Sequence, residues 1–337
     1  MPISPVRRPL KTSSLCWRLT IEVMMTKNVL LPENQIRDRL IGYFMILLAI
    51  SCWGLIGPLG RFGLDAGLAP LEVAFWRASL GGLFFIIHAM FSGKWRIDLN
   101  RRIIFTLFGI PGVAALFYVY QVGVREAGAS MTAILQYTAP VWVALWARLF
   151  FSESITWLKV VSITMSIGGA AMVSLSGGGL PQGASLLGII AGLASGLLYS
   201  LHFLLGNKYM QNVSPITLYM HILPAGALAM LPFFEFEIQT KSIMGVWAPM
   251  IAMGFFTGWA GFWAYGEGLK RLAVTQAAVM TTLEPFVAAL FAFAWWGENF
   301  PPLGWVGAVF VVAAVILSIK PVKRQTMDTV AVSAQPE

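Results

Sequence analysis

The sequence is poor in charged residues and in cysteine. Only 11% of its 337 residues are charged, whereas about 25% is usual for soluble domains. The two cysteines, Cys16 and Cys52, lie far apart, and neither has a second thiol at metal-ligand spacing. We therefore expect no disulfide between them, no metal site and no cofactor.

Catalytic motifs are also missing. The sequence has no H-E-x-x-H pair and no Gly-rich phosphate loop after a strand. The sequence therefore gives no support to a zinc-dependent enzyme or to the use of ATP.

Long apolar stretches are abundant. Hydrophobic residues make up 58% of the chain, in runs of about 20 residues that match the thickness of a bilayer. Backbone groups in lipid must bond within their own segment, so these runs predict helices. The expected spans are residues 40–60, 70–90, 103–123, 127–147, 158–175, 185–205, 215–233, 244–267, 273–295 and 303–319.

The chain matches itself at an offset of 145 residues. The offset places residues 117–120 (FYVY) over residues 262–265 (FWAY), and Pro140 over Pro285. Two copies of one five-span unit therefore fill most of the chain. Because five is odd, the second copy must enter the bilayer upside down, as in many secondary transporters.

We therefore predict an all-α membrane protein of ten transmembrane helices, arranged as two inverted five-helix repeats. The expected organisation is a cytoplasmic N-terminal tail over residues 1–38, repeats over 39–176 and 184–321, and a cytoplasmic C-terminal tail over 322–337.

The distribution of Lys and Arg predicts the orientation. With the N-terminus inside, Arg61, Arg125 and Lys241 fall outside and Arg77 falls within a span, which leaves nineteen of the 23 basic residues inside. Both termini are then cytoplasmic and the protein lies in the inner (plasma) membrane. This bias also accounts for the net charge of +8, and no basic stripe lies on a soluble domain, so we expect no nucleic-acid partner.

Two segments carry a family resemblance. Residues 133–145 read AILQYTAPVWVAL and are followed by Glu153, and their repeat mate, residues 281–290, reads TTLEPFVAAL and is followed by Glu298. Together with Phe75-Trp76-Arg77, they resemble helices of the EamA family of the drug/metabolite transporter superfamily. The resemblance covers about residues 39–320. It implies ten helices, inverted halves, a central cavity with the fifth and tenth helices peripheral, and export of small metabolites.

Charges inside spans are the first site candidates, because a charge in hydrocarbon costs roughly 2.5–3.5 kcal/mol and usually faces a cavity or a partner. Arg77 lies about two turns into the second span, and Glu284 lies near the middle of the ninth. A carboxyl there can cycle between charged and neutral forms and couple transport to protons. It can equally be a structural group that pairs with a neighbouring helix, and both interpretations stay open.

Prolines and aromatic residues complete the candidate list. Pro140 and Pro285 each remove a helical hydrogen bond at equivalent depths, which favours paired hinges or lining groups over packing alone. Polar and aromatic side chains within the spans supply the predicted substrate contacts, which with Arg77 and Glu284 are Gln136, Tyr137, Trp263 and Tyr265.

Taken together, these features predict a secondary active transporter that exports a small metabolite, such as an amino acid or a related organic ion, by alternating access. The expected partners are the small-molecule substrate, the lipid bilayer and, under the coupling interpretation, protons. A membrane-embedded enzyme, or a sensor or scaffold without transport, is the alternative, although Glu153 and Glu298 fall at opposite faces of the expected topology and cannot act together as an acidic pair. Substrate-dependent flux would separate a transporter from both.

Overall fold

The computed structural model describes residues 33–176, 185–210, 212–233, 240–297 and 301–319. The chain divides into two units, Met1–Ile41 and Gly42–Glu337. The described part of the first unit is residues 33–41, which begin helix α2. Most of the expected N-terminal tail, all of the C-terminal tail and Glu298 lie outside the described residues.

The regular elements of the described residues are all helical, and each expected span corresponds to one helical segment. Several segments are built from consecutive helices. In chain order they are α2 (Glu33–Gly54) with α3 (Ile56–Asp65); α4 (Pro70–Ser92); α5 (Leu99–Gly109), η1 (Ile110–Ala115) and α6 (Leu116–Ala127); α7 (Ala129–Gln136) with α8 (Ala139–Phe151); α9 (Trp157–Ser176); α10 (Leu186–Tyr209); α11 (Pro215–Met230) with η2 (Leu231–Phe233); α12 (Thr240–Met253), η3 (Gly254–Ala260) and α13 (Gly261–Leu269); α14 (Val274–Thr281) with α15 (Glu284–Trp296); and α16 (Pro302–Ile319).

Eight stretches within the described residues are long and apolar enough to cross a membrane, and residues 302–318 form a shorter apolar helix. The all-α membrane fold predicted from the composition is confirmed. Many large apolar side chains remain exposed on these helices, among them Phe91, Trp157 and Val309. A bilayer solvates such side chains, because hydrocarbon is as apolar as they are.

The 145-residue offset is visible in the local geometry. The π-helix η1 begins at Ile110, and the π-helix η3 begins at Gly254, one residue from the position that the offset predicts. Helix α4 crosses η3 so closely that a Cβ on Gly81 would lie 2.8 Å from Gly258 Cα. Its repeat mate α11 crosses α5, where a Cβ on Gly109 would lie 2.6 Å from the Ile222 carbonyl oxygen. The two repeats therefore interlock through equivalent crossings.

The fourth and ninth spans break at equivalent positions. Helix α7 ends at Gln136 and α8 begins at Ala139, whereas α14 ends at Thr281 and α15 begins at Glu284. Each break precedes a proline, Pro140 or Pro285, which cannot donate a backbone hydrogen bond to the preceding turn. The prolines thus mark the discontinuities that the hinge hypothesis requires, while movement at these points stays a prediction.

The first and sixth spans differ, although they are repeat mates. The first is interrupted at Leu55, where α2 gives way to α3, and Pro58 lies in the first turn of α3. The equivalent position of the sixth span is Phe203, and α10 runs without interruption from Leu186 to Tyr209. A proline in a helix lacks an N–H and crowds the carbonyl four residues earlier, which explains the break in the first span alone.

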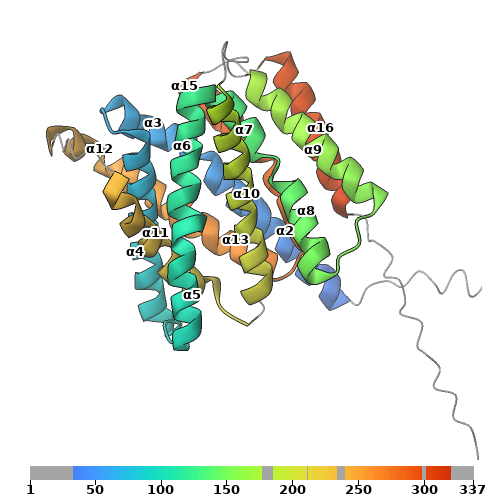
Figure 1. The fold of residues 1–337 in the computed structure, drawn as a ribbon, viewed down its shortest axis with the longest axis horizontal. Coiled ribbons are helices and arrows are strands. Elements are labelled where there is room, and N and C mark those ends of the chain that lie inside the picture. The colour runs from blue at the N-terminus through green and yellow to red at the C-terminus, as the bar shows by residue number, and fades with distance from the viewer. Residues whose placement is uncertain (1–32, 177–184, 211, 234–239, 298–300, 320–337) are drawn as a thin grey trace, which may run out of the picture. The chain divides into compact units, whose positions relative to one another are not determined.

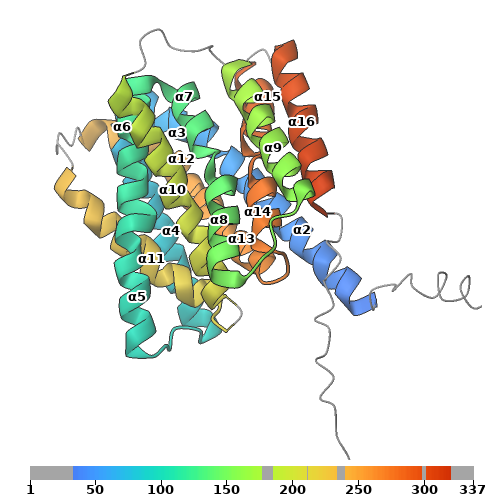
Figure 2. The same ribbon diagram turned by 45° about the vertical axis from the view of Figure 1, so that its right-hand side comes forward.

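The fifth and tenth spans pack against each other at one edge of the second unit. Helices α9 and α16 run side by side in both views (Figure 1, Figure 2). Gly169 and Gly307 form their closest approach, since a Cβ on either would lie 2.6 Å from the other's carbonyl oxygen. Neither helix contributes a residue to the lining of the cavity described next.

Candidate functional site

The second unit contains a cavity of about 430 Å³. This volume lies within the range of roughly 300–1,000 Å³ that is usual for small-molecule sites. Its lining extends to one end of the unit through Leu64, Pro70 and Val124, near the end of α3, the start of α4 and the end of α6, and we take this end as the mouth of the cavity. We call this end of the unit the open face. Deeper lining residues come from α4, α6, α7, α15 and the end of α12.

Arg77 enters the cavity from the middle of α4. Its guanidinium carbon lies 5.1 Å from the centroid of the Phe117 ring and 5.9 Å from that of Phe262. Such cation-π contacts stabilise a guanidinium that has left water. Its Nε atom is buried, and no residue in the described part of the chain accepts a hydrogen bond from it. Arg77 therefore keeps hydrogen-bonding capacity for a ligand.

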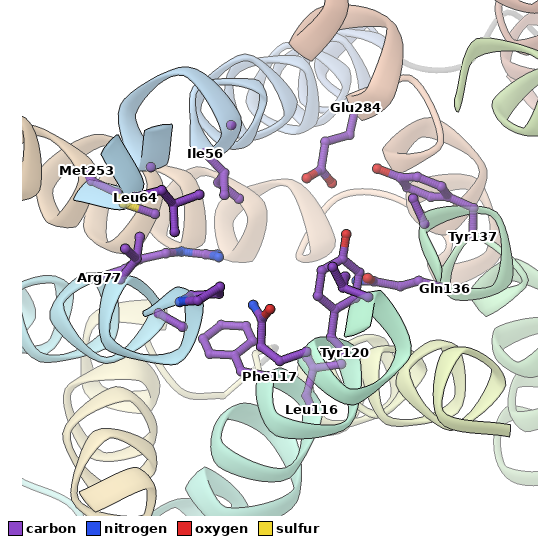
Figure 3. A pocket seen from close by; sticks show the side chains of 18 residues that line it. Ile56, Leu64, Arg77, Leu116, Phe117, Tyr120, Gln136, Tyr137, Met253 and Glu284 are labelled. Atoms are coloured by element: carbon purple, nitrogen blue, oxygen red, sulfur yellow. The ribbon is translucent and has the colours of Figure 1, made fainter. Parts of the chain in front are cut away.

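Glu284 enters the cavity at the break in the ninth span. It is the first residue of α15, so its carboxylate lies at the positive end of a helix dipole, which favours a negative charge there. The break before Pro285 therefore places a helix N-terminus, and with it the Glu284 carboxylate, at the cavity. Figure 3 shows the carboxylate and the Arg77 guanidinium pointing into the same space from different helices.

Arg77 and Glu284 do not pair directly. Among the described residues, neither forms an ion pair, although both line the same cavity. In surroundings of low dielectric the attraction between opposite charges is strong, so a ligand that carries both charges gains by bridging them. The arrangement thus suits a dipolar ion.

The rest of the lining is largely apolar and aromatic. Gln136 and Tyr137 lie at the end of α7, and Phe117, Tyr120 and Gln121 project from α6 (Figure 3). The sequence indicated Gln136 and Tyr137, and it did not single out Phe117 or Tyr120 as lining residues. Their spacing of three residues, continued by Val124, is the helical periodicity that could have identified this face of α6.

Two predicted contact residues do not line this cavity. The ring of Trp263 stacks on Trp259 at 6.2 Å, and Trp259 Nε1 donates a hydrogen bond to His88 Nδ1 at 3.2 Å. Tyr265 is 1% exposed and packs against Trp53 at 5.3 Å. The structure therefore brings together Arg77, Glu284, Gln136 and Tyr137 but leaves Trp263 and Tyr265 elsewhere.

The end of the unit opposite the mouth is closed by polar contacts. The Glu153 carboxylate accepts hydrogen bonds from Lys159 Nζ at 2.8 Å and from the Thr275 hydroxyl at 3.0 Å. Glu267 pairs there with Lys270 and Arg271. We call this end the closed face. None of these side chains lines the cavity.

No group of three or more His, Cys, Asp or Glu side chains within the described ranges is arranged to hold a metal ion.

Comparison with known proteins decides the family. The EamA-like transporter family matches the chain twice, over residues 40–175 and 186–320. The chain belongs to the EamA-like transporter family. This membership agrees with the resemblance of the two Pro-to-Glu segments, and the family consists of transporters rather than enzymes.

Relatives of this EamA protein support the same assignment. A "probable terminal-alkyne amino-acid exporter" of Streptantibioticus cattleyicolor is 25% identical over 285 residues, covering 84% of this chain and 93% of the relative. The uncharacterised transporter YyaM of Bacillus subtilis is 23% identical, covering 74% of this chain and 84% of the relative. A crystal structure of a further protein shares the fold, with a TM-score of 0.71 at 17% identity, over 84% of this chain and 96% of the other.

The duplicated EamA domain is consistent with two inverted repeats. The chain is thus a multi-pass membrane transporter, whose partners are the bilayer and a small-molecule substrate.

Proposed function

We propose that this EamA transporter exports α-amino acids with uncharged, apolar side chains by alternating access. One observation carries the proposal: Arg77 and Glu284 face a single cavity with no ion pair between them. An α-amino acid presents a carboxylate to the guanidinium and an ammonium to the carboxylate. The name of the Streptantibioticus relative, an amino-acid exporter, supports the same class.

The remaining lining supports an apolar side chain on the substrate. Arg77 and Glu284 are the charged residues among the side chains that line the cavity, while Phe117, Tyr120, Leu116 and Met253 offer apolar surface. A charged substrate side chain would lose its hydration there without gaining a partner. Discrimination against charged amino acids follows from this cost.

The orientation is part of the proposal. If nineteen basic residues lie on the cytoplasmic side, both termini are cytoplasmic in the plasma membrane and the closed face is the cytoplasmic one. The conformation described here is then outward-open. For an exporter it corresponds to the state that releases substrate.

Two roles for Glu284 follow from its position. It binds the substrate ammonium in both. Under proton coupling, a proton replaces the ammonium on the carboxylate after release, which neutralises the buried charge during the return step. Without coupling, the carboxylate returns paired with a second substrate, and the protein is an exchanger.

The proposal is tested by transport in proteoliposomes of the purified protein. Uptake of radiolabelled L-leucine is measured by counterflow and under an imposed proton gradient, against panels of amino acids, amines and carboxylates. We expect saturable leucine uptake that is inhibited by other apolar amino acids. Two analogues of leucine test the charged groups: 4-methylpentanoate lacks the ammonium, and 3-methylbutylamine lacks the carboxylate. Each should inhibit uptake more than tenfold less potently than leucine, because each charge-assisted contact contributes about 1.5–3 kcal/mol. Equal inhibition by the amine or the carboxylate alone would overturn the zwitterion assignment.

A further inference from the structure

A group of buried aromatic side chains lies between the cavity and the closed face. We call it the aromatic cluster, and it consists of Trp53, Tyr199, His202, Phe203, Tyr219, Phe262 and Tyr265. The side chains come from α2, α10, α11 and α13. Tyr219 lies one turn into α11 and Tyr265 one turn before the end of α13, so both are near the closed face.

The rings of the cluster are in mutual contact. The Phe262 centroid lies 5.3 Å from that of Trp53, 4.8 Å from Tyr219 and 5.7 Å from His202. Tyr265 joins through Trp53 and through Phe203, each at 5.3 Å. Packed aromatic rings therefore fill the space between the cavity and the closed face in the present conformation.

The cluster contains polar atoms that lack partners. Trp53 Nε1, His202 Nδ1 and the hydroxyls of Tyr219 and Tyr265 are buried, with no hydrogen-bond partner in the described part of the chain. Tyr219 and Tyr265 are each 1% exposed, and His202 is 3% exposed. Buried polar groups are nearly always hydrogen-bonded, because leaving them unpaired costs stability. Four such atoms in one contact group require an explanation.

Packing alone does not explain them. Phe in place of Tyr219 or Tyr265 would keep the ring contacts and remove the unpaired hydroxyl. A structural plug would therefore be more stable without these hydroxyls. Their presence indicates that they find partners in another conformation of the transporter.

The cluster is continuous with the cavity. Phe262 belongs to it, and the Arg77 guanidinium in the cavity lies 5.9 Å from the Phe262 ring. His202 adds a link to the third span, because its Nε2 lies 2.6 Å from the Gly112 carbonyl oxygen within η1. A substrate that moves from the closed face toward Arg77 would therefore pass these side chains.

The polar atoms of the cluster match the head group of an amino acid. The hydroxyls of Tyr219 and Tyr265 and the indole N–H of Trp53 can donate hydrogen bonds, and a carboxylate accepts them. Because His202 Nε2 carries the proton that it donates to Gly112, Nδ1 is left as an acceptor for an ammonium N–H. The cluster thus repeats the donor and acceptor pattern of Arg77 and Glu284 without formal charge.

We propose that the aromatic cluster is a second substrate site, which binds the carboxylate and ammonium of the amino acid when the closed face opens. This inference deepens the proposed function and rests on it. The neutral site would receive the substrate from the closed face and pass it to the charged pair. Because it lacks charge, it binds the head group less tightly and does not trap the substrate.

The test compares substrate affinity from the two faces. Leucine transport is measured in right-side-out and inside-out membrane vesicles made with the full chain and with Tyr219→Phe and Tyr265→Phe variants. A Trp157→Cys variant shows which vesicle preparation exposes the closed face. Trp157 begins α9 beside Lys159 and is 76% exposed, so an impermeant maleimide should label the variant more than the parent protein in that preparation.

We expect each substitution to raise KM for leucine presented at the closed face by roughly fivefold, the loss of one hydrogen bond, and to leave KM at the open face unchanged. The melting temperature of each variant should be equal to or higher than that of the parent protein, because an unpaired group is removed. Tyr118→Phe is the matched control: Tyr118 is 42% exposed and packs on Phe233 outside the cluster, so neither KM should change.

An unchanged KM at the closed face in both variants, with leucine transport intact, would overturn the second site and leave the proposed function standing. An equal rise in KM at both faces would also overturn it, since that result places the hydroxyls in the open cavity. Absence of zwitterion transport by the parent protein would instead refute the proposed function, on which this site depends.

Discussion

The Thr275 hydroxyl donates a hydrogen bond of 3.0 Å to the carboxylate of Glu153. Glu153 follows α8 in the first EamA domain, and Thr275 lies in the first turn of α14 in the second. Lys159 donates to the same carboxylate oxygen, so the contact is partly buried and charge-assisted. The closed face is thus held by a bond between the two halves of the transporter.

Weakening this bond should open the closed face. We expect Glu153→Gln to increase labelling of a cysteine placed at Tyr219, which is 1% exposed near the closed face, by about fivefold from that side, for a loss of ~1 kcal/mol. Maleimide labelling rates in vesicles measure the effect. Glu126→Gln is the control, because Glu126 bonds Ser185 at the other end of the unit. Similar labelling in both variants would show that Glu153 does not hold the face closed.

Arg77 should determine recognition of the substrate carboxylate. We expect Arg77→Gln to raise KM for leucine by roughly 10- to 100-fold, the loss of a charge-assisted hydrogen bond, while inhibition by 3-methylbutylamine is retained. Arg77→Lys should recover part of the affinity, because the charge returns without the planar fork. A parallel loss for leucine and the amine would assign Arg77 to structure instead.

Glu284→Gln separates the two coupling roles of this residue. Under proton coupling, the variant should lose both net leucine flux driven by a proton gradient and its pH dependence, while counterflow persists at reduced affinity. Transport assays over about pH 5.5–8.5 measure this, because an equilibrium that includes proton binding changes with pH. Glu267→Gln, which alters a carboxylate at the closed face, should keep the pH dependence. Survival of transport and of its pH dependence in Glu284→Gln would make the residue structural.

The crossing of α4 and η3 should tolerate only glycine at position 81. A Cβ there would meet the Gly258 backbone at 2.8 Å, so Gly81→Ala should destabilise the protein by about 1–3 kcal/mol and lower its melting temperature in detergent. Gly168→Ala is the matched control, because a Cβ there would meet no atom within 4 Å. Equal melting temperatures for the two variants would contradict the close crossing.

Pro58 should keep the cavity mouth open. Pro58→Ala restores the missing N–H and removes the ring that crowds Gly54, so we expect α2 and α3 to favour one continuous helix, as in α10. The open state then becomes less populated, and the affinity for leucine presented at the open face falls. Binding measured from that face checks this, and an unchanged affinity would mean that packing against α4 and α12 alone sets the bend.

Four of the residues that line the cavity could be predicted from the sequence, for a physical reason. Charges inside apolar helices are costly and are kept where they face a cavity, so Arg77 and Glu284 stand out from composition alone. Gln136 and Tyr137 follow from their place before Pro140 in the repeated segment. Trp263 and Tyr265 could not be placed in the same way, because helical periodicity gives the face of a helix but not the neighbour that covers it.

The sequence by itself determined the membrane environment, the ten helical segments, the duplication and the family, because hydropathy, length and a 145-residue offset are properties of the chain. The tertiary structure decided how the two copies differ. The bend near Pro58 opens one face, while the unbroken α10 and the Glu153–Thr275 bond close the other. The bend near Pro58 is already a difference in sequence, since the repeat mate of Pro58 is Phe203. Which side chains meet across the closed face could not be predicted, because that depends on the neighbours that each copy packs against.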